Sequence, residues 1–369
     1  MPCNTFAPAM KNRNLSRRSR PVAIWLLVGV AMIIVQILLG GITRLTGSGL
    51  SITEWKPFLG AIPLLSEQDW QAAFSKYQQI AQYKHLNSHF DLSDFKFIYF
   101  WEWFHRLWGR LLGIVFLIPF LIFIVQGRFK KDMIRPLAML FVLGGLQGLI
   151  GWIMVKSGLN DEDLYVNHFR LAIHFIAAMG LLVFTFWFAL NLLVQERAFA
   201  ANNQLRNLTL SIIALLVLQL VYGAFMAGLK AGPFAPTWPD INGDLIPENI
   251  STFRGRELST FSTLVNHPIA IHFVHRTLAY LLTILIVLWT LKALPVKQSG
   301  LFNSLKFWPL ILVFLQVFLG IMSVLTSYKA LPQGWGIFEW NAQLHQLVAM
   351  FLLLSLVIAA FVLRQPKAV

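Results

Sequence analysis

The sequence predicts an all-α integral membrane protein, in which eight transmembrane helices form two tandem, pseudo-symmetric four-helix bundles and both termini are cytoplasmic. Three observations support this fold class. Hydrophobic residues make up 57% of the 369 residues and charged residues only 12%, a balance too apolar for a water-soluble domain of this length. Eight uncharged stretches approach the roughly 20 residues that cross a bilayer core as a helix. Motifs of the first four stretches recur in the last four.

Two of the eight expected spans, 111–127 and 277–291, are short for a crossing. Their helices must therefore include the preceding turns around His105-Arg106 and His275-Arg276, which places both histidines at membrane depth. In chain order, the expected spans are 21–43, 111–127, 136–155, 171–195, 207–229, 277–291, 307–328 and 340–363.

The long segment between the first two spans contains a further predicted helix. Ser66-x-x-Asp69 has the spacing of a capping box, and Trp70, Phe74 and Tyr77 fall on one face of the helix that would follow. We predict an amphipathic helix within residues 66–84. We expect it to rest on the bilayer surface, with a cover over an interior pocket as the alternative.

The charge distribution predicts the orientation of the chain. If the N-terminus lies inside, the inner segments carry the whole net charge of +14, with only Asp132 and Glu196 as acids. This is the asymmetry that the positive-inside rule describes, so the basic balance indicates a lipid bilayer and no nucleic-acid partner. The first 20 residues lack acids, as mitochondrial presequences do, but they run directly into a span. We expect a bacterial inner (plasma) membrane, with the mitochondrial inner membrane as the alternative.

The single cysteine, Cys3, lies in the inner tail. The sequence therefore predicts no disulfide framework in the outer loops and no thiol-based metal or redox site.

An internal repeat divides the chain into two units. Each odd-numbered span carries a Gln-x-x-x-Gly motif near its outer end, for which we expect close helix packing with interhelical hydrogen bonds from Gln, or room for a flat ligand. The motifs are Gln36/Gly40, Gln147/Gly151, Gln219/Gly223 and Gln316/Gly320. The predicted parts are a basic cytoplasmic tail (1–21), an N-terminal four-helix unit (22–195), a cytoplasmic linker (196–206), a C-terminal four-helix unit (207–364) and a cytoplasmic tail (365–369).

Each even-numbered span carries a histidine near its outer start. His105 and His174 are 69 residues apart, and His275 and His345 are 70 apart. Each unit thus presents two imidazoles at one depth, which is how a helical bundle holds a haem iron. Zinc sites usually add cysteine or acid, so we predict haem-iron ligation by these four histidines. Four other histidines are expected to be interface anchors, namely His85, His89, His168 and His267.

Three arginines beside these histidines are candidate ligands of haem propionates. Arg106 and Arg276 directly follow a predicted ligand, and Arg170 lies four residues before His174 on the same helical face. Arginine binds carboxylates through paired hydrogen bonds. The alternative is that these side chains only reach out to the membrane interface.

The two units differ at one acidic position. Glu102 lies three residues before His105 on the same helical face, and His272 occupies the matching place in the second unit. Only one of the two histidine pairs has a carboxylate beside it. This favours chemistry in the first unit and a structural or electron-carrying haem in the second. An ordinary solvated interfacial acid is the alternative.

Five segments resemble the haem A synthase family, in its alphaproteobacterial and mitochondrial branch. The resemblance extends from about residue 22 to residue 363. The segments are GGITRLTGSGLSITEWKPFLGAIP (40–63), EWFHR (102–106), RLAIH (170–174), HFVHR (272–276) and NAQLHQ (341–346).

This resemblance implies oxidation of the C8 methyl of haem O to a formyl group by successive hydroxylations, for terminal oxidase assembly. It implies that His105 and His174 face the substrate haem, that His275 and His345 ligate haem b, and that Glu102 is the essential carboxylate. Haem O synthase, an electron partner and a second copy of the chain are the expected partners. Another branch of the family has a cysteine pair in the first outer loop, which this sequence lacks.

Two other functions remain open from the residues. One is a di-haem b-type electron carrier, such as a quinone oxidoreductase subunit, and the other is a transporter built from parallel repeats. Glu102, which has no counterpart in the second unit, argues against symmetric electron transfer between two equivalent haems.

Overall fold

The computed structural model describes residues 20–56, 59–248, 250–296, 299–331 and 334–365. Residues 1–19 of the predicted inner tail, which include Cys3, lie outside these residues. Within the described residues, eight helices are long and apolar enough to cross a membrane, which confirms the predicted all-α integral membrane fold with eight spans. These are α1 (Arg20–Leu45), α4 (Leu92–Val125), α5 (Lys131–Lys156), α6 (His168–Leu193), α7 (Asn203–Gly228), α9 (Pro268–Ala293), α11 (Trp308–Leu325), which continues the apolar run of α10 (Gly300–Leu305), and α12 (Ile337–Val362).

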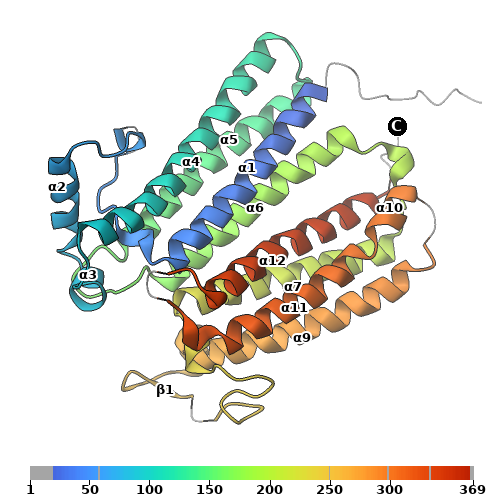
Figure 1. Ribbon diagram of the computed structural model, residues 1–369. Coiled ribbons are helices and arrows are strands. Elements are labelled where there is room, and N and C mark those ends of the chain that lie inside the picture. Colours follow the sequence, from blue (N-terminus) through green and yellow to red (C-terminus); the bar gives the residue numbers. More distant parts are fainter. Residues whose placement is uncertain (1–19, 57–58, 249, 297–298, 332–333, 366–369) are drawn as a thin grey trace, which may run out of the picture.

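Shorter elements lie in the connections. They are the helices α2 (Glu67–Tyr77), α3 (Ala81–Leu86) and α8 (Thr260–Asn266), the strands β1 (Thr252–Phe253) and β2 (Arg256–Glu257), which pair antiparallel, and the single 3₁₀ turns η1 (Ser48–Leu50), η2 (Leu59–Ala61), η3 (Glu196–Ala198), η4 (Gly232–Phe234) and η5 (Ser327–Lys329). Figure 1 shows α2, α3 and β1 at one end of the long helices, here called the loop end. The start of α1, α10 and the chain's C-terminal end lie at the opposite end, here called the terminal end.

The two short apolar stretches belong to longer helices, as predicted. The helix α4 begins at Leu92, where the Asp91 side chain accepts hydrogen bonds from the backbone N–H groups of Ser93 and Asp94 and the Asp94 side chain bonds back to Asp91 N. The helix α9 begins at Pro268, whose missing N–H costs nothing in a first helical turn. His105 and His275 therefore lie within continuous helices.

The helices of each half pack in a comparable order. In the first half, α1 packs against α4 and α6, and α5 packs against α6. In the second half, α7 packs against α9 and α12, and α11 packs against α12. The halves meet through α6 with α7 and through α1 with α12. The side-by-side arrangement of α12, α7, α11 and α9 is visible in Figure 1.

Burial is uneven between the halves. In the most apolar 18-residue stretch of each helix, 67% of the residues of α12 are buried inside the protein, compared with 0% in α4 and 6% in α5. The pair α4 and α5 therefore leaves most of its surface outside the protein core, and the first half is the more open one.

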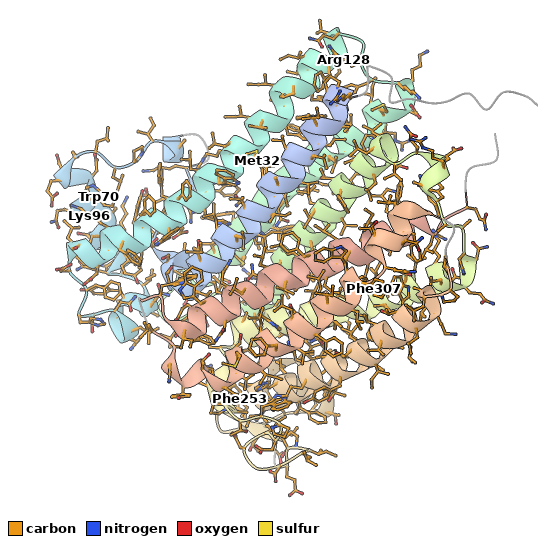
Figure 2. All side chains as sticks on the ribbon, turned by 45° about the vertical axis from the view of Figure 1, so that its right-hand side comes forward. Met32, Trp70, Lys96, Arg128, Phe253 and Phe307 are labelled. Atoms are coloured by element: carbon orange, nitrogen blue, oxygen red, sulfur yellow. The ribbon has the colours of Figure 1, made fainter. Side chains whose placement is uncertain are left out.

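The predicted amphipathic helix is present as α2, with Ser66 accepting a hydrogen bond from Asp69 N at 3.1 Å. Its expected place on the bilayer surface is wrong, because its apolar face packs within the protein against the start of α4. Phe74 and Tyr77 are buried with Phe95 and Ile98, and the Lys96 ammonium lies 5.4 Å from the centre of the Trp70 ring (Figure 2).

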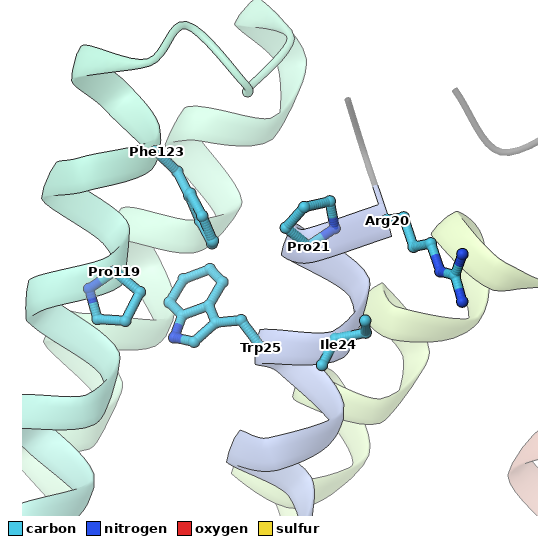
Figure 3. A pocket seen from close by; sticks show the side chains of 6 residues that line it. All are labelled: Arg20, Pro21, Ile24, Trp25, Pro119 and Phe123. Carbon is cyan, nitrogen blue, oxygen red and sulfur yellow. The ribbon is translucent and has the colours of Figure 1, made fainter. Parts of the chain in front are cut away.

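A shallow apolar pocket lies at the terminal end, between the start of α1 and the last turns of α4 (Figure 3). Trp25 lines it between Pro119 and Phe123, and the Trp25 indole donates a hydrogen bond to the Val115 carbonyl at 2.9 Å. The residues of α1 that line the pocket lie about 15–20 residues of helix, or roughly 22–30 Å, from Gly40 at the first histidine site. The pocket is therefore separate from the predicted chemistry.

Candidate functional site

Each of the four predicted ligand histidines lies against the glycine of one Gln-x-x-x-Gly motif. A methyl group added to these glycines would come within 2.8–3.3 Å of the imidazole ring, so the absence of a side chain lets each ring approach the helix backbone. The contacts are His105 of α4 on Gly40 of α1, His174 of α6 on Gly151 of α5, His275 of α9 on Gly223 of α7, and His345 of α12 on Gly320 of α11.

The glutamines of the same motifs bond to the histidines, as one of the two predicted roles requires. In three cases the Gln Nε2 donates to the histidine backbone carbonyl: Gln36 to His105 at 3.2 Å, Gln147 to His174 at 2.9 Å and Gln219 to His275 at 3.0 Å. The fourth case differs, because His345 Nδ1 lies 3.0 Å from the Gln316 carbonyl and Gln316 Nε2 lies 3.1 Å from His345 Nε2. Glutamine Nε2 also lies near a ring nitrogen in two of the first three cases, 3.2 Å from His174 Nδ1 and 3.3 Å from His275 Nε2.

The arrangement of the imidazoles fits a haem in the second half. The ring centres of His275 and His345 are 6.4 Å apart, with planes at 68°. Metal–imidazole bonds are about 2 Å long, so this spacing leaves room for one iron between the two rings. Buried polar atoms without a partner, including His275 Nδ1 and Gln316 Oε1, lie beside this position. Two axial imidazoles are sufficient for haem, because the macrocycle supplies the remaining ligands.

In the first half, His105 and His174 are near enough to act on each other electrostatically. The described residues contain no group of three or more His, Cys, Asp or Glu side chains that could hold a metal ion. The candidate site of each half is therefore a pair of imidazoles in a helical bundle.

Glu102 is buried, with 2% of its surface exposed, and both of its carboxylate oxygens have partners. Its Oε2 accepts hydrogen bonds from Ser51 Oγ at 2.7 Å and from the Ile52 backbone N–H at 2.8 Å, and its Oε1 pairs with Arg106. Such an acid is held in a single position, so the alternative of a solvated interfacial anchor is wrong. Its partners Ser51 and Ile52 tie the loop after α1 to α4.

Arg106 completes this connection between loop and helix. Besides Glu102, its guanidinium donates to the Ile52 carbonyl at 2.9 Å and to the Glu54 carbonyl at 3.1 Å. Most of its donor groups are therefore used within the protein, although its Nε–H is not among them. The Arg106 side chain therefore does not simply reach out to the membrane interface, which was the alternative role for it.

The second half repeats the connection with different chemistry. Arg276 donates from Nε to His272 Nε2 at 3.1 Å, in the place where Arg106 meets a carboxylate. It also donates to the carbonyls of Thr237 at 2.6 Å and Asp240 at 2.6 Å in the loop after α7. Arginine thus ties the outer loop to the helix in both halves, but among the described residues it pairs with a carboxylate only in the first.

The remaining predicted residues lie further from the paired histidines. Arg170 donates to the Ile153 carbonyl at 2.9 Å and is largely exposed. His168, which was expected to anchor the interface, instead bonds the two halves, since its Nε2 lies 2.9 Å from the Val265 carbonyl. His267 is buried and precedes α9 as its N-cap residue.

Charged groups in the loops around the site are stabilised by hydrogen bonds. Those from Lys56 and Lys76 lower the pKa of Glu54, which lies beside the Arg106 contact. The Gly243 backbone N–H lowers the pKa of Asp240 in the same way. Burial raises the pKa of Tyr77 to about 12. Glu54 and Asp240 therefore remain charged, while the hydroxyl of Tyr77, at the end of α2, remains neutral.

Comparison with known proteins gives a consistent family. The profile of the cytochrome oxidase assembly protein family matches residues 23–357. Three similar proteins are each named heme A synthase. The one from Flavobacterium psychrophilum is 39% identical over 344 residues, covering 91% of this chain and 96% of its own length. The one from Rhodospirillum centenum is 45% identical over 285 residues (77% and 75%), and that from Maricaulis maris is 39% identical over 350 residues (95% and 98%).

Proposed function

Because the chain belongs to the cytochrome oxidase assembly protein family together with heme A synthases, we propose that it is itself a haem A synthase. In this proposal it is an oxidoreductase that converts haem O to haem A, by successive hydroxylations of the C8 methyl to a formyl group. The observation that carries the proposal is a difference between the histidine sites of the two halves, which otherwise match. Both have a histidine pair and an arginine tied to a loop, but among the described residues only the arginine of the first half, Arg106, pairs with a buried carboxylate, Glu102.

We assign the substrate to the first half. Haem O carries a long isoprenoid chain, so its site needs more space than a site for haem b. Gly144 and Gly148 lie seven and three residues before Gly151, respectively, on one side of α5, and a methyl group added at either would meet nothing within 4 Å. The matching positions in α11 are Val313, which is buried, and Val317. The open first half therefore suits the larger haem.

We assign a permanently bound haem b to the second half. The buried helix α12 supplies His345, and α9 supplies His275 at a distance that accommodates an iron. A haem surrounded by packed helices exchanges slowly and can pass electrons while the other site turns over. The expected partner for those electrons is a separate redox protein or carrier.

The bound haems supply the redox chemistry, and the residues of the chain supply position and charge. His105 and His174 orient the substrate by its iron. Glu102, fixed by Ser51 and Arg106, holds a negative charge near the macrocycle edge. There it can accept a proton from the methyl group being oxidised or stabilise positive charge that develops beside it.

Propionate binding by Arg106, Arg276 and Arg170 was predicted from their positions. Arg106 and Arg276 already donate hydrogen bonds to loop carbonyls. We therefore propose that they bind propionates only through those N–H groups that the carbonyls do not use. Their main role in this proposal is to hold the outer loops above the histidine pairs. For Arg170, at the edge of α6, we also keep propionate binding as part of the proposal.

We place the protein in a bacterial inner membrane, with the loop end outside, because the basic surplus lies at the opposite ends of the helices. A reporter enzyme fused after Val369 should be active only in the cytoplasm, and one inserted near Gln78 only outside. The reverse pattern would contradict this orientation. Haem O synthase and a second copy of the chain are the partners that the proposal expects in this membrane.

The experiment that tests the function is to express the chain in a host that makes haem O but no haem A, and to extract its haems. Appearance of a formyl-bearing haem is expected. An unchanged haem profile with extra bound haem b would favour the electron carrier, and a purified protein without haem would favour the transporter.

A further inference from the structure

Arg44 is an arginine close to the first histidine pair for which the function described so far has no role. It lies in the last turn of α1, four residues after Gly40, on which His105 rests. Residues four apart share one helical face, and helical side chains lean toward the N-terminal turn. The Arg44 side chain therefore extends over the turn that contacts His105, at the loop end of the bundle.

The Arg44 guanidinium has no partner among the described residues, where no hydrogen bond or ion pair involves its side chain. It is nevertheless only partly exposed. This contrasts with Arg106, which uses its donors on Glu102 and on two loop carbonyls. A half-buried cation without an acceptor is unfavourable, so the position favours an anion that is supplied by a ligand.

Glu339 is the carboxylate whose charge acts on Arg44, but it does not pair with it. Glu339 is 1% exposed, and its two oxygens accept hydrogen bonds from the backbone N–H groups of Leu331 and Gly336, both at 2.9 Å. Each oxygen thus accepts one hydrogen bond from the loop before α12, and no ion pair joins Glu339 to Arg44 among the described residues. Glu339 favours a positive charge at Arg44 while leaving the guanidinium available.

The backbone that carries Arg44 is fixed against α12. Gln343 donates to the Leu38 carbonyl at 3.2 Å, and Gln346 donates to the Ile37 carbonyl at 3.0 Å. The end of α1 is therefore held in place by the second half. The cation is presented to the site in a defined position.

This cation is specific to the first histidine site. The residues four positions after the glycine in the other three Gln-x-x-x-Gly motifs are Val155, Ala227 and Val324. Helix packing alone thus does not require arginine at this place.

We propose that Arg44 binds a propionate of the substrate haem while His105 faces its iron. The proposal rests on the function described above, in which the first half takes haem O. In this proposal the main contact with the haem propionate comes from Arg44 at the end of α1. The role of Arg106 is then to hold the loop after α1.

The test uses the purified full-length protein with haem b in its second site. The first site is titrated with haem b and, separately, with haem b dimethyl ester, whose propionates carry no charge. The absorption change that His105→Ala abolishes defines first-site binding, provided that this variant keeps its second-site spectrum. Arg44→Gln should weaken binding of haem b about ten- to a hundredfold, as expected for hydrogen bonds to a charged group, and leave binding of the ester unchanged.

Arg44→Lys should recover part of the loss, and Arg128→Gln, at the terminal end, should bind both probes as the wild type does. Equal losses for haem b and its ester, or no loss for either, would overturn the role of Arg44. Wild-type protein that binds neither probe at the first site would overturn the proposed function, and this inference with it.

Discussion

Glu102→Gln is expected to lower the rate of haem A formation about 10²–10⁴-fold, the usual contribution of a positioned acid or base. Glutamine keeps the size of the side chain and one oxygen that can accept hydrogen bonds from Ser51 and Ile52. It removes the negative charge and the basicity, so Arg106 loses its ionic partner. Haem O or a partly oxidised haem should accumulate, which chromatography of extracted haems measures.

The matched control is His272→Gln, at the corresponding place in the second half. It removes the imidazole that accepts a hydrogen bond from Arg276 but leaves Glu102 and its partners intact. This variant should keep most of the activity. A normal rate of haem A formation in Glu102→Gln would mean that the carboxylate only fastens the loop to α4.

His275→Ala and His345→Ala are each expected to abolish the low-spin haem spectrum of the purified protein. The ring centres of the two imidazoles are 6.4 Å apart, and either substitution would remove one of the two ligands that this proposal gives to the haem b iron. The absorption spectrum of the reduced protein measures this directly. His85→Ala, outside the paired sites, is the control that should retain it. Retention of the spectrum in both ligand variants would refute the assignment of haem b to the second half.

The membrane-spanning helices were predictable because hydropathy depends only on local sequence. The ends of these helices were less predictable. The helix α4 continues to Leu92, well before the apolar stretch at 111–127, because Asp91 and Asp94 cap it in the loop region. An apolar stretch marks the part of a helix inside lipid and carries no information on how far the helix extends beyond it.

The histidine positions were predictable because the repeat places an imidazole at one depth in four helices. The glycine that each imidazole contacts was not predictable, because it depends on which helices are neighbours in the fold. The contacts of Glu102 with Ser51 and Ile52 join residues that lie about 50 positions apart, beyond any local pattern. Its pairing with Arg106 could have been inferred, because residues four apart on a helix are neighbours.

The position of α2 was wrong for a related reason. Its amphipathic pattern predicts an apolar face but does not identify what covers that face. The start of α4 projects beyond the apolar stretch and presents Phe95 and Ile98, which pack with Phe74 and Tyr77 of α2. A protein surface therefore takes the place that we had assigned to lipid.

The central claim is that the first histidine pair turns over haem O while the second holds haem b. It is tested most directly by identifying the haems extracted from two purified double variants made in a host that supplies haem O. His105→Ala/His174→Ala should retain haem b and contain no haem O or haem A. His275→Ala/His345→Ala should lose haem b and still bind haem O. The same haem composition in both variants, or the reverse assignment, would contradict the account.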